Sequence, residues 1–281
     1  MAPCFGTIAR IARGNGHTKV LCQIDNVEPH EHHLTDKPFN RYYLHSVDGF
    51  VYMSEQVHSE LRAYSDAPAL FSPHPLFENF GERVERSEAC VRLGLDPANR
   101  YVLFFGLIRD YKGLDLLLDA WAQLRRAGRT EGRRLIVAGE FYTAREPYLN
   151  RIADNGLQDE VLLHDRFIPD DDVKYYFSAA DFVVQPYKTA TQSGVTQIAY
   201  QFCVPMVVTK VGGLAEIVPD GRVGYVCEPT PEGVAGAIER MYEGDTLQRF
   251  RENCVEERRR FSWEEMCSRI TELYGLVASG K

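Results

Sequence analysis

The sequence lacks any hydrophobic run approaching the roughly 20 residues that a membrane-spanning helix requires. It also lacks an excess of basic residues, because 32 lysines and arginines stand against 40 aspartates and glutamates and give a net charge of -8. An acidic chain is a poor partner for nucleic acid, although a local basic site for a phosphorylated ligand is compatible with this balance. We therefore expect neither an integral membrane protein nor a nucleic-acid-binding protein.

The seven cysteines show no pairing pattern. Their number is odd, and no two stand at the spacing of a metal site or a redox motif. Reduced thiols and a cytoplasmic location are therefore expected. At 281 residues, 44% of them hydrophobic, the chain is long enough for one large domain or two ordinary ones.

The first 80 residues have the pattern of part of an α/β domain. Buried strands are predicted at residues 19–24, 48–53 and 69–71, and helices at residues 8–13 and 55–64. Ser54 is placed to cap the second of these helices. A chain that opens almost directly on a helix and one inner strand is expected to lack the first part of such a domain. The turn-rich residues 72–88 form the predicted linker.

The rest of the chain alternates strands with helices. Strands are predicted at residues 101–105, 134–138, 161–164, 182–185, 206–209 and 224–227. Helices are predicted at residues 114–127, 147–155, 171–178, 194–202 and 232–243, followed by 246–260 and 262–278. This alternation predicts a parallel, doubly wound sheet, in which ligands bind beyond the carboxyl ends of the strands.

Two cations follow the first of these strands. The segment is YVLFFGLIRDYKG, in which Gly106 permits a sharp exit and Arg109 and Lys112 precede the next helix. Fixed cations and the positive end of a helix favour an anion such as a diphosphate. For an isolated turn of this kind, solvated surface charges would be the simpler interpretation.

Two further segments point to the same edge of the sheet. In QPYKTATQSGVTQIA, Ser193 is predicted to cap a helix whose first amides, at Gly194, Val195 and Thr196, are free to approach a ligand. In VVTKVGGLAEIV, Gly212 and Gly213 allow the backbone before Glu216 conformations that other residues rarely adopt. A carboxylate there would accept hydrogen bonds from sugar hydroxyls. The alternatives are an ordinary capped helix and an acid that complements a helix dipole.

These motifs together resemble glycosyltransferase family 4. The resemblance is carried, in order, by FFGLIRDYKGLD, LIVAGE, HDRFIPDDDV, ADFVVQPY and VPMVVTKVGGLAEIV. It implies a GT-B fold, in which a C-terminal Rossmann-like doubly wound parallel sheet accompanies an N-terminal α/β domain. It also implies retaining, metal-independent transfer of a sugar from a nucleotide-activated donor to a glycan or lipid-linked acceptor. The expected division is a partial N-terminal domain at 1–80, a nucleotide-sugar-binding domain at 81–261, and a helix at 262–281 that crosses back to the N-terminal domain.

The resemblance also implies roles for particular residues. Arg109, Lys112 and Glu216 are the catalytic candidates. The donor-binding candidates are Gly106, Arg109, Lys112, Glu140, Phe167, Ile168, Ser193, Gly194, Val195, Gln197, Gly212, Gly213 and Glu216. Among these, Arg109 and Lys112 match the cationic pair on the donor diphosphate, and Phe167 and Ile168 match the loop that holds the base.

The sequence departs from the family at one place. Relatives carry two glutamates eight positions apart around this helix, whereas TATQSGVTQIAY contains no acid. Gln197 is the nearest substitute for the glutamate that binds the ribose, and an amide can hydrogen bond to a diol. The missing glutamates and the missing front of the N-terminal domain leave open a nucleotide-sugar-binding protein without turnover or a truncated inactive fragment. A second alternative is another enzyme of the same architecture, a GT-B-type nucleotide-sugar epimerase, which would need acid and base carboxylates facing the sugar.

The segment VLCQIDNVEPHEHH corresponds to a strand and loop that face the acceptor in relatives. Asp25, Glu28, His30 and Glu31 are therefore the acceptor-side candidates. The histidines of this loop could bind a metal, but a solvated loop is commoner and the family needs none, so no metal and no cofactor are expected.

The last predicted helix, residues 262–278, is amphipathic. It fits a membrane-surface helix poorly because Glu264, Glu265 and Glu272 offset its few cations. Peripheral membrane contact stays open as an expectation.

Overall fold

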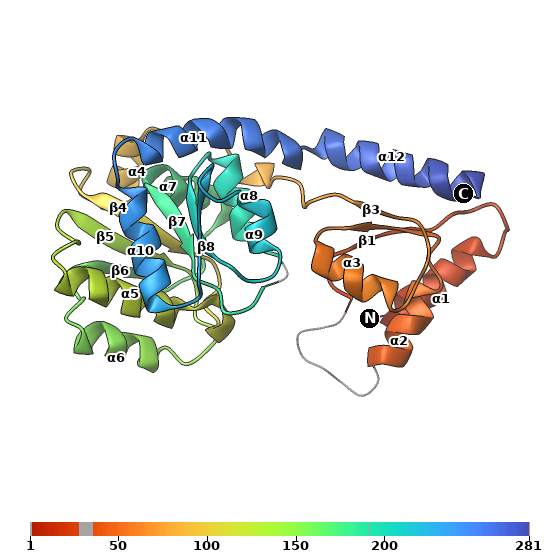
Figure 1. The fold of residues 1–281 in the computed structure, drawn as a ribbon, viewed down its shortest axis with the longest axis horizontal. Coiled ribbons are helices and arrows are strands. Elements are labelled where there is room, and N and C mark those ends of the chain that lie inside the picture. The colour runs from red at the N-terminus through yellow and green to blue at the C-terminus, as the bar shows by residue number, and fades with distance from the viewer. Residues whose placement is uncertain (1, 28–35, 191, 281) are drawn as a thin grey trace. The chain divides into compact units, whose positions relative to one another are not determined.

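The computed structural model describes residues 2–27, 36–190 and 192–280 (Figure 1). The chain forms two compact units, one of Met1–Pro75 with Arg260–Lys281 and the other of Leu76–Arg259. No helix in the described part of the chain combines the length and apolar character needed to cross a membrane. The fold class is α/β with parallel sheets, as predicted.

The smaller unit is built on a three-stranded parallel sheet of order β1-β2-β3. The strands are β1 (Leu21–Ile24), β2 (Gly49–Tyr52) and β3 (Ala69–Phe71). The helices are α1 (Ala2–Arg13), α2 (Asp36–Leu44), α3 (Glu55–Arg62) and α12 (Trp263–Ser279). Ser54 caps α3 as predicted, since its side chain accepts a hydrogen bond from the amide of Val57 at 3.3 Å.

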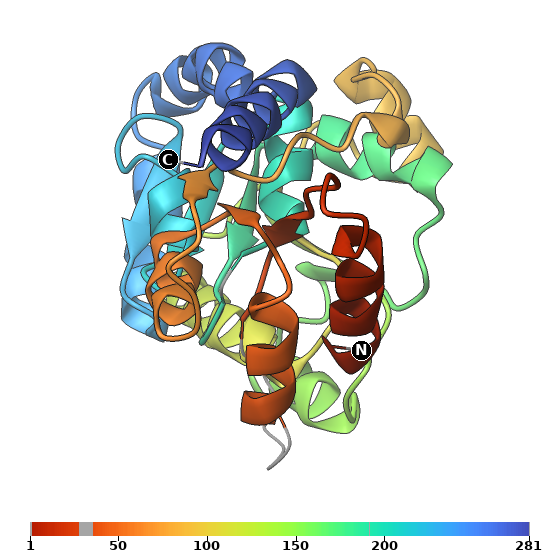
Figure 2. The same ribbon diagram turned by 90° about the vertical axis from the view of Figure 1, so that its right-hand side faces the viewer.

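Both faces of this small sheet are buried. Alternate residues of β2 point to opposite faces, so Phe50 packs with Leu61 of α3 while Val51 packs with Leu273 of α12. Figure 2 views the molecule from the side of this unit, with α12 in dark blue on the side of the sheet opposite α3. Helix α2 is not predicted from the sequence, because its nine residues carry only one short aromatic repeat at helical spacing, Phe39, Tyr42 and Tyr43.

The larger unit is built on a six-stranded parallel sheet of order β6-β5-β4-β7-β8-β9. Its strands are β4 (Arg100–Phe105), β5 (Arg133–Ala138), β6 (Val161–His164), β7 (Phe182–Gln185), β8 (Met206–Thr209) and β9 (Gly224–Cys227). The last four begin and end at the predicted residues, and β4 and β5 begin one residue earlier. Short runs of β-branched and aromatic residues buried on both faces make these strands recognisable in the sequence.

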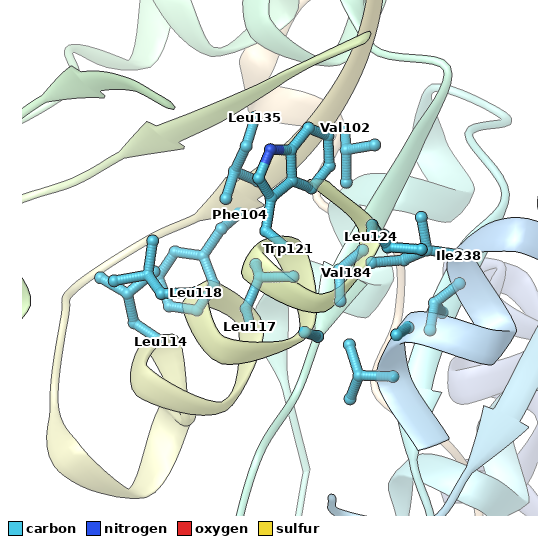
Figure 3. Close-up of a cluster of buried hydrophobic side chains, with 14 of the residues drawn as sticks. Val102, Phe104, Leu114, Leu117, Leu118, Trp121, Leu124, Leu135, Val184 and Ile238 are labelled. Carbon is cyan, nitrogen blue, oxygen red and sulfur yellow. The ribbon is translucent and has the colours of Figure 1, made fainter. Parts of the chain in front are cut away.

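Helices flank this sheet on both faces. They are α4 (Arg86–Leu93), α5 (Leu114–Arg126), α6 (Glu146–Asp154), α7 (Asp170–Ala179), α8 (Gly194–Gln201), α9 (Leu214–Ile217), α10 (Pro231–Met241) and α11 (Thr246–Glu257). Short 3-10 turns lie at Glu78–Phe80, Asp110–Lys112 and Arg258–Phe261. On one face of the sheet, Leu117, Leu118 and Trp121 of α5 pack on β4 and β5 without exposure to solvent (Figure 3). The indole of Trp121 keeps a hydrogen-bond partner, since its Nε1 donates to Glu160 at 2.9 Å.

The order of the strands reverses between β4 and β7. From β4 the chain moves outward through β5 to β6, then returns beside β4 and continues through β7 and β8 to β9. The loops that follow β4 and β7 therefore leave the sheet in opposite directions. In doubly wound sheets, this reversal opens a crevice at the carboxyl ends of the two strands.

A substitution at Gly113, directly before α5, can test how closely the loop after β4 approaches the loop after β7. Its φ is 68°, and a Cβ at this position would overlap the carbonyl oxygen of Pro186, which follows β7. Gly128 has a φ of 70° and nothing within 4 Å of its Cβ position, so it is the matched control. Gly128→Ala should cost ~1–2 kcal/mol for the left-handed backbone alone, and Gly113→Ala a further ~1–3 kcal/mol for the overlap.

The measurement is urea unfolding followed by Trp121 fluorescence in a Trp263→Phe background, which removes the signal from the smaller unit. Equal losses in the two alanine variants would contradict the close approach.

Candidate functional site

A pocket of about 320 Å³ lies at the reversal point, beyond the carboxyl ends of β4 and β7. Three segments line it. They contribute Phe77 and Phe80 from the start of the unit, Phe105, Gly106, Tyr111 and Lys112 after β4, and Tyr187, Gln192, Ser193, Gly194, Val195 and Ile198 after β7. The sequence predicts Gly106, Lys112, Ser193, Gly194 and Val195 at such an edge, and the structure brings these residues together.

Specific contacts hold the two loops side by side. The amide of Lys188 donates to the carbonyl of Tyr111 at 2.7 Å, and the Lys188 ammonium pairs with Asp115 at 2.7 Å. The hydroxyl of Thr209 donates to the carbonyl of Tyr187 at 2.6 Å and fixes the second loop to β8. These contacts tie the two loops to each other, to helix α5 and to strand β8.

Lys112 lines the pocket, and no described residue supplies a counter-ion for its ammonium. Its Nζ lies 3.2 Å from the place that a Cβ would take at Gly106 and 5.6 Å from the ring centroid of Tyr187. It makes no hydrogen bond or ion pair with any residue that the structure describes. Burial, and after it the charge of Arg109, lower the pKa of Lys112 to about 8. Glycine is favoured at position 106 because its φ is 99°, a backbone conformation that residues with a side chain rarely adopt.

Arg109 lies outside the pocket lining, on the solvent side of the same loop. Its guanidinium rests over the ring of Tyr142, 5.1 Å from the centroid, and has no hydrogen-bonding partner among the described residues. Asp110 anchors the loop by accepting hydrogen bonds from Thr143 and Tyr148, both at 3.1 Å. The positive charge of Arg109 is therefore carried near the pocket by a loop that Asp110 anchors.

The start of α8 faces the pocket from the other side. The amides of Gly194 and Val195 find no acceptor among residues 2–27, 36–190 and 192–280. The prediction that the amide of Thr196 is also free is wrong, because it donates to the carbonyl of Ser193 at 3.1 Å. The prediction that the Ser193 side chain caps this helix is wrong. Its hydroxyl pairs instead with the hydroxyl of Tyr187 at 3.1 Å, because that buried phenol needs a partner. The first turn of α8 is left open, as an anion site requires.

Gln197 is buried on α8 with 1% of its surface exposed, outside the pocket lining. Both polar atoms of its amide lack a partner within the described part of the chain, and so does the Nε2 of Gln192, which lines the pocket. Unpartnered buried amides are costly and unusual in a folded protein.

The remaining donor-side candidates stand on other loops beyond the same edge of the sheet. Glu140 follows β5 and is exposed, while its carbonyl accepts a hydrogen bond from the amide of Ile108 at 2.8 Å. Phe167, 66% exposed, and the buried Ile168 follow β6. Glu216 is exposed on the short helix α9, preceded by Gly212 and Gly213. None of these residues lines the 320 Å³ pocket.

Only one of the four acceptor-side candidates lies within the described residues. Asp25 follows β1 in the smaller unit and is exposed. Glu28, His30 and Glu31 lie outside the described residues. Within the described residues, no group of three or more His, Cys, Asp or Glu side chains is arranged to hold a metal ion.

Sequence reasoning missed the aromatic rim of the pocket. Phe77, Phe80, Tyr111 and Tyr187 come from three segments that are far apart in the chain. Tyr187 carries a usable signal, because it directly follows a buried strand and Pro186. The phenylalanines carry none, since they fall in the stretch that resembles a linker.

A doubly wound sheet with a cationic pocket at its reversal point defines a Rossmann-like α/β protein that binds a ligand at the switch point. Residues 99–244 match the family model described as glycosyl transferases group 1, and the chain belongs to this family. The predicted family is thereby confirmed.

Curated relatives include D-inositol 3-phosphate glycosyltransferases. The chain is 31% identical over 245 residues to D-inositol 3-phosphate glycosyltransferase 2 of Catenulispora acidiphila, covering 82% of this chain and 56% of that protein. It is 27% identical over 236 residues to the D-inositol 3-phosphate glycosyltransferase of Corynebacterium diphtheriae, covering 80% of this chain and 55% of that protein. The chain thus spans about half the length of the curated relatives it matches.

Solved structures show the same fold at lower identity. Sucrose-phosphate synthase of Thermosynechococcus elongatus superimposes with a TM-score of 0.80 and 20% identity, covering 98% of this chain and 72% of that one. HepE of Anabaena, crystallised with UDP, gives a TM-score of 0.79 and 19% identity, covering 98% of this chain and 77% of that one. The fold is of the GT-B type, as predicted.

The exposed Arg109 is expected to depress the pKa of Lys112 through charge repulsion. Titration of the Lys112 Cε chemical shift should give a pKa of about 8 in the unmodified chain, below the ordinary value of ~10.4. Arg109→Gln should raise it, because a nearby positive charge is removed. Arg126→Gln, at the far end of α5, removes the same charge elsewhere and should leave it unchanged.

An ordinary lysine titration in the unmodified chain would contradict the burial of the ammonium. An unchanged pKa in Arg109→Gln would show that the two cations do not interact.

Proposed function

We propose that this chain is a retaining, metal-independent glycosyltransferase that takes a sugar from a UDP- or GDP-sugar. The observation that carries the proposal is the unpaired ammonium of Lys112 facing the free amides of Gly194 and Val195 across the pocket. A diphosphate would satisfy both groups at once. Its negative charge would also return the pKa of Lys112 toward the ordinary value.

The same groups suit the chemistry of sugar transfer. When the glycosidic bond to the donor breaks, negative charge develops on the departing diphosphate. Lys112 and the start of α8 are fixed before that charge appears, so they stabilise it without reorganising. Arg109 would move from the face of Tyr142 to the outer phosphate oxygens. In this proposal the protein supplies, with fixed charges and amides, the stabilisation that a metal ion gives in other transferases.

Other residues receive roles as part of the proposal. Phe167 and Ile168 would hold the base, Gln197 would meet the ribose, and Glu216 would accept hydrogen bonds from the sugar. Gly212 and Gly213 would let the backbone approach the sugar, and Glu140 would contribute to nucleotide binding. Asp25, with Glu28, His30 and Glu31, would face the acceptor.

The relatives support the choice of substrates. HepE was crystallised with UDP and glucose, which favours uridine diphosphate donors for the first trials. The proposed acceptor is a glycan or a lipid-linked sugar. The names of the curated relatives add inositol phosphate as a further acceptor to be tried. We also propose that the reaction takes place in the cytoplasm, where nucleotide sugars and reduced thiols occur together.

A second candidate is a nucleotide-sugar-binding protein that does not transfer. It is favoured by one observation: the buried amide of Gln197, the residue nearest to the position at which the family resemblance implies a glutamate, has no partner among the described residues. The two candidates share the binding step and differ in the release of nucleoside diphosphate.

Incubation with UDP-glucose and with GDP-mannose, with release of UDP or GDP as the readout, separates the two candidates. The transferase should release nucleoside diphosphate, and Lys112→Ala should lower kcat/KM about 100-fold by removing a fixed positive charge from the leaving group. Lys174→Ala, on α7, is the control and should retain full activity. Binding of a donor without any release would favour the second candidate. Equal rates in Lys112→Ala and the unmodified chain would exclude the proposed role of Lys112.

The affinity for UDP should depend on pH in a way that identifies Lys112. With a pKa of about 8 the free ammonium loses its proton above that pH, while the bound form keeps it. The affinity should therefore be flat just above neutral pH and then fall by up to ~tenfold per pH unit. Lys112→Arg keeps its charge at every pH tested and should remove the fall. A flat profile in the unmodified chain would contradict a deprotonating lysine in the site.

A further inference from the structure

A second pocket, of about 490 Å³, lies at the opposite edge of the same sheet, where β4 and β7 begin. Its polar lining includes Arg100 at the start of β4, Asp181 directly before β7, Tyr242 after α10, and Gln248 and Arg251 on α11. All of these belong to the larger unit. None has a role in the transfer proposed above.

Arg251 is held in place with part of its hydrogen-bonding capacity unused. Its Nη2 donates to the carbonyls of Ala180 and Asp181 at 3.0 and 3.3 Å. Its Nε is buried and has no partner in the part of the chain that the structure describes. This Nε is closed to the pocket, but the Nη1 of Arg251 also makes no hydrogen bond with a described residue and is not buried, so it is the donor available to a ligand. A fixed guanidinium on the wall of a cavity is suited to binding an oxyanion.

Several arginine charges converge here around a single buried carboxylate. Burial lowers the pKa of Arg251, and the charges of Arg83, Arg86 and Arg100 lower it further, while Asp181 opposes them. Arg86 donates to the carbonyls of residues 97 and 99 at 2.8 and 2.6 Å, which are neutral acceptors and leave its charge uncompensated.

Asp181 cannot balance this charge alone. It is 3% exposed and already accepts a hydrogen bond from the amide of Tyr101 at 2.9 Å, while Arg100 lies 3.5 Å away. Of the other carboxylates of the lining, Asp245 pairs with Arg249 at 3.3 Å, whereas Glu252 accepts from the neutral amide of Gln248 at 3.0 Å and keeps its charge. The four arginines that act on one another here, Arg83, Arg86, Arg100 and Arg251, still outnumber Asp181 and Glu252. Outside the pocket lining, Arg133 adds a further cation 4.1 Å from the ring centroid of Tyr242, and its buried Nη1 lacks a partner among the described residues.

Residues at the start of α11 line the same pocket. This helix has 12 residues, and the side chain of Asp245 does not cap it. The amides of Leu247 and Gln248, both on the pocket wall, have no acceptor in the described residues. The positive end of a helix is thus added to the arginine charges.

We propose that this pocket is a second anion site that binds a phosphate group, carried by a metabolite of about the size of a sugar phosphate. The arginines and the start of α11 would hold the phosphoryl oxygens. The volume exceeds what inorganic phosphate alone needs, and Tyr242 and Met241 offer an apolar wall to the rest of the ligand. Free inorganic phosphate is the other source of the same chemistry, and the test separates the two.

The test is calorimetric titration of the chain carrying Arg109→Ala and Lys112→Ala, which removes the cations of the first pocket. Glucose 6-phosphate and inorganic phosphate are titrated separately at fixed ionic strength. Saturable binding of one equivalent is expected, weakened at least tenfold by Arg251→Gln and by Arg100→Gln. Arg126→Gln, at the same edge of the sheet but outside the pocket, is the matched control and should bind as before.

Arg100→Gln is the second variant in case Arg251→Gln does not fold. Its side chain is 61% exposed, so its replacement removes no core contact. Tighter binding of glucose 6-phosphate would identify a phosphorylated metabolite, and equal binding of both probes would identify the phosphate group alone as the ligand. The absence of saturable binding, or binding that survives both Arg251→Gln and Arg100→Gln, would overturn the proposal.

Discussion

The pairing of β4 with β7 is the constraint on which the candidate site depends. The chain leaves these strands in opposite directions, yet the backbone at Gly113 approaches Pro186 so closely that no side chain fits between them. The amide of Lys188 then binds the carbonyl of Tyr111 and fixes the two loops to each other. This contact places the ammonium of Lys112 opposite the first turn of α8.

The site is assembled from groups that the fold leaves unsatisfied. Among the described residues, Lys112 has no counter-ion and the first two amides of α8 have no acceptors, and outside the pocket lining the buried amide of Gln197 has no partner either. Each of these features costs stability. The core around Trp121 provides the compensating burial of apolar surface. A bound anion would satisfy the cation and the amides together, so binding and local stability are linked.

The sequence predicts the fold well where burial alone decides it. Strand β7 begins with its apolar run at Phe182 and ends at Gln185, one residue after the run, because a parallel strand buried on both faces is mostly apolar. Helix α2 escapes prediction because contacts with the core, rather than its own pattern, stabilise it. The predicted capping by the Ser193 side chain fails because a capping prediction considers only neighbouring residues. The hydroxyl of Ser193 pairs instead with Tyr187, whose position is fixed by tertiary packing. The aromatic rim requires knowing which loops meet, and that information lies in the topology of the sheet.

A crystal structure of this chain with UDP tests the central claim most directly. The account predicts that a phosphate oxygen lies within ~2.7–3.2 Å of Lys112 Nζ and that another accepts from the amides of Gly194 and Val195. Arg109 should leave the ring of Tyr142 and approach the diphosphate. A diphosphate bound elsewhere, with Lys112 still without a counter-ion, would contradict the account.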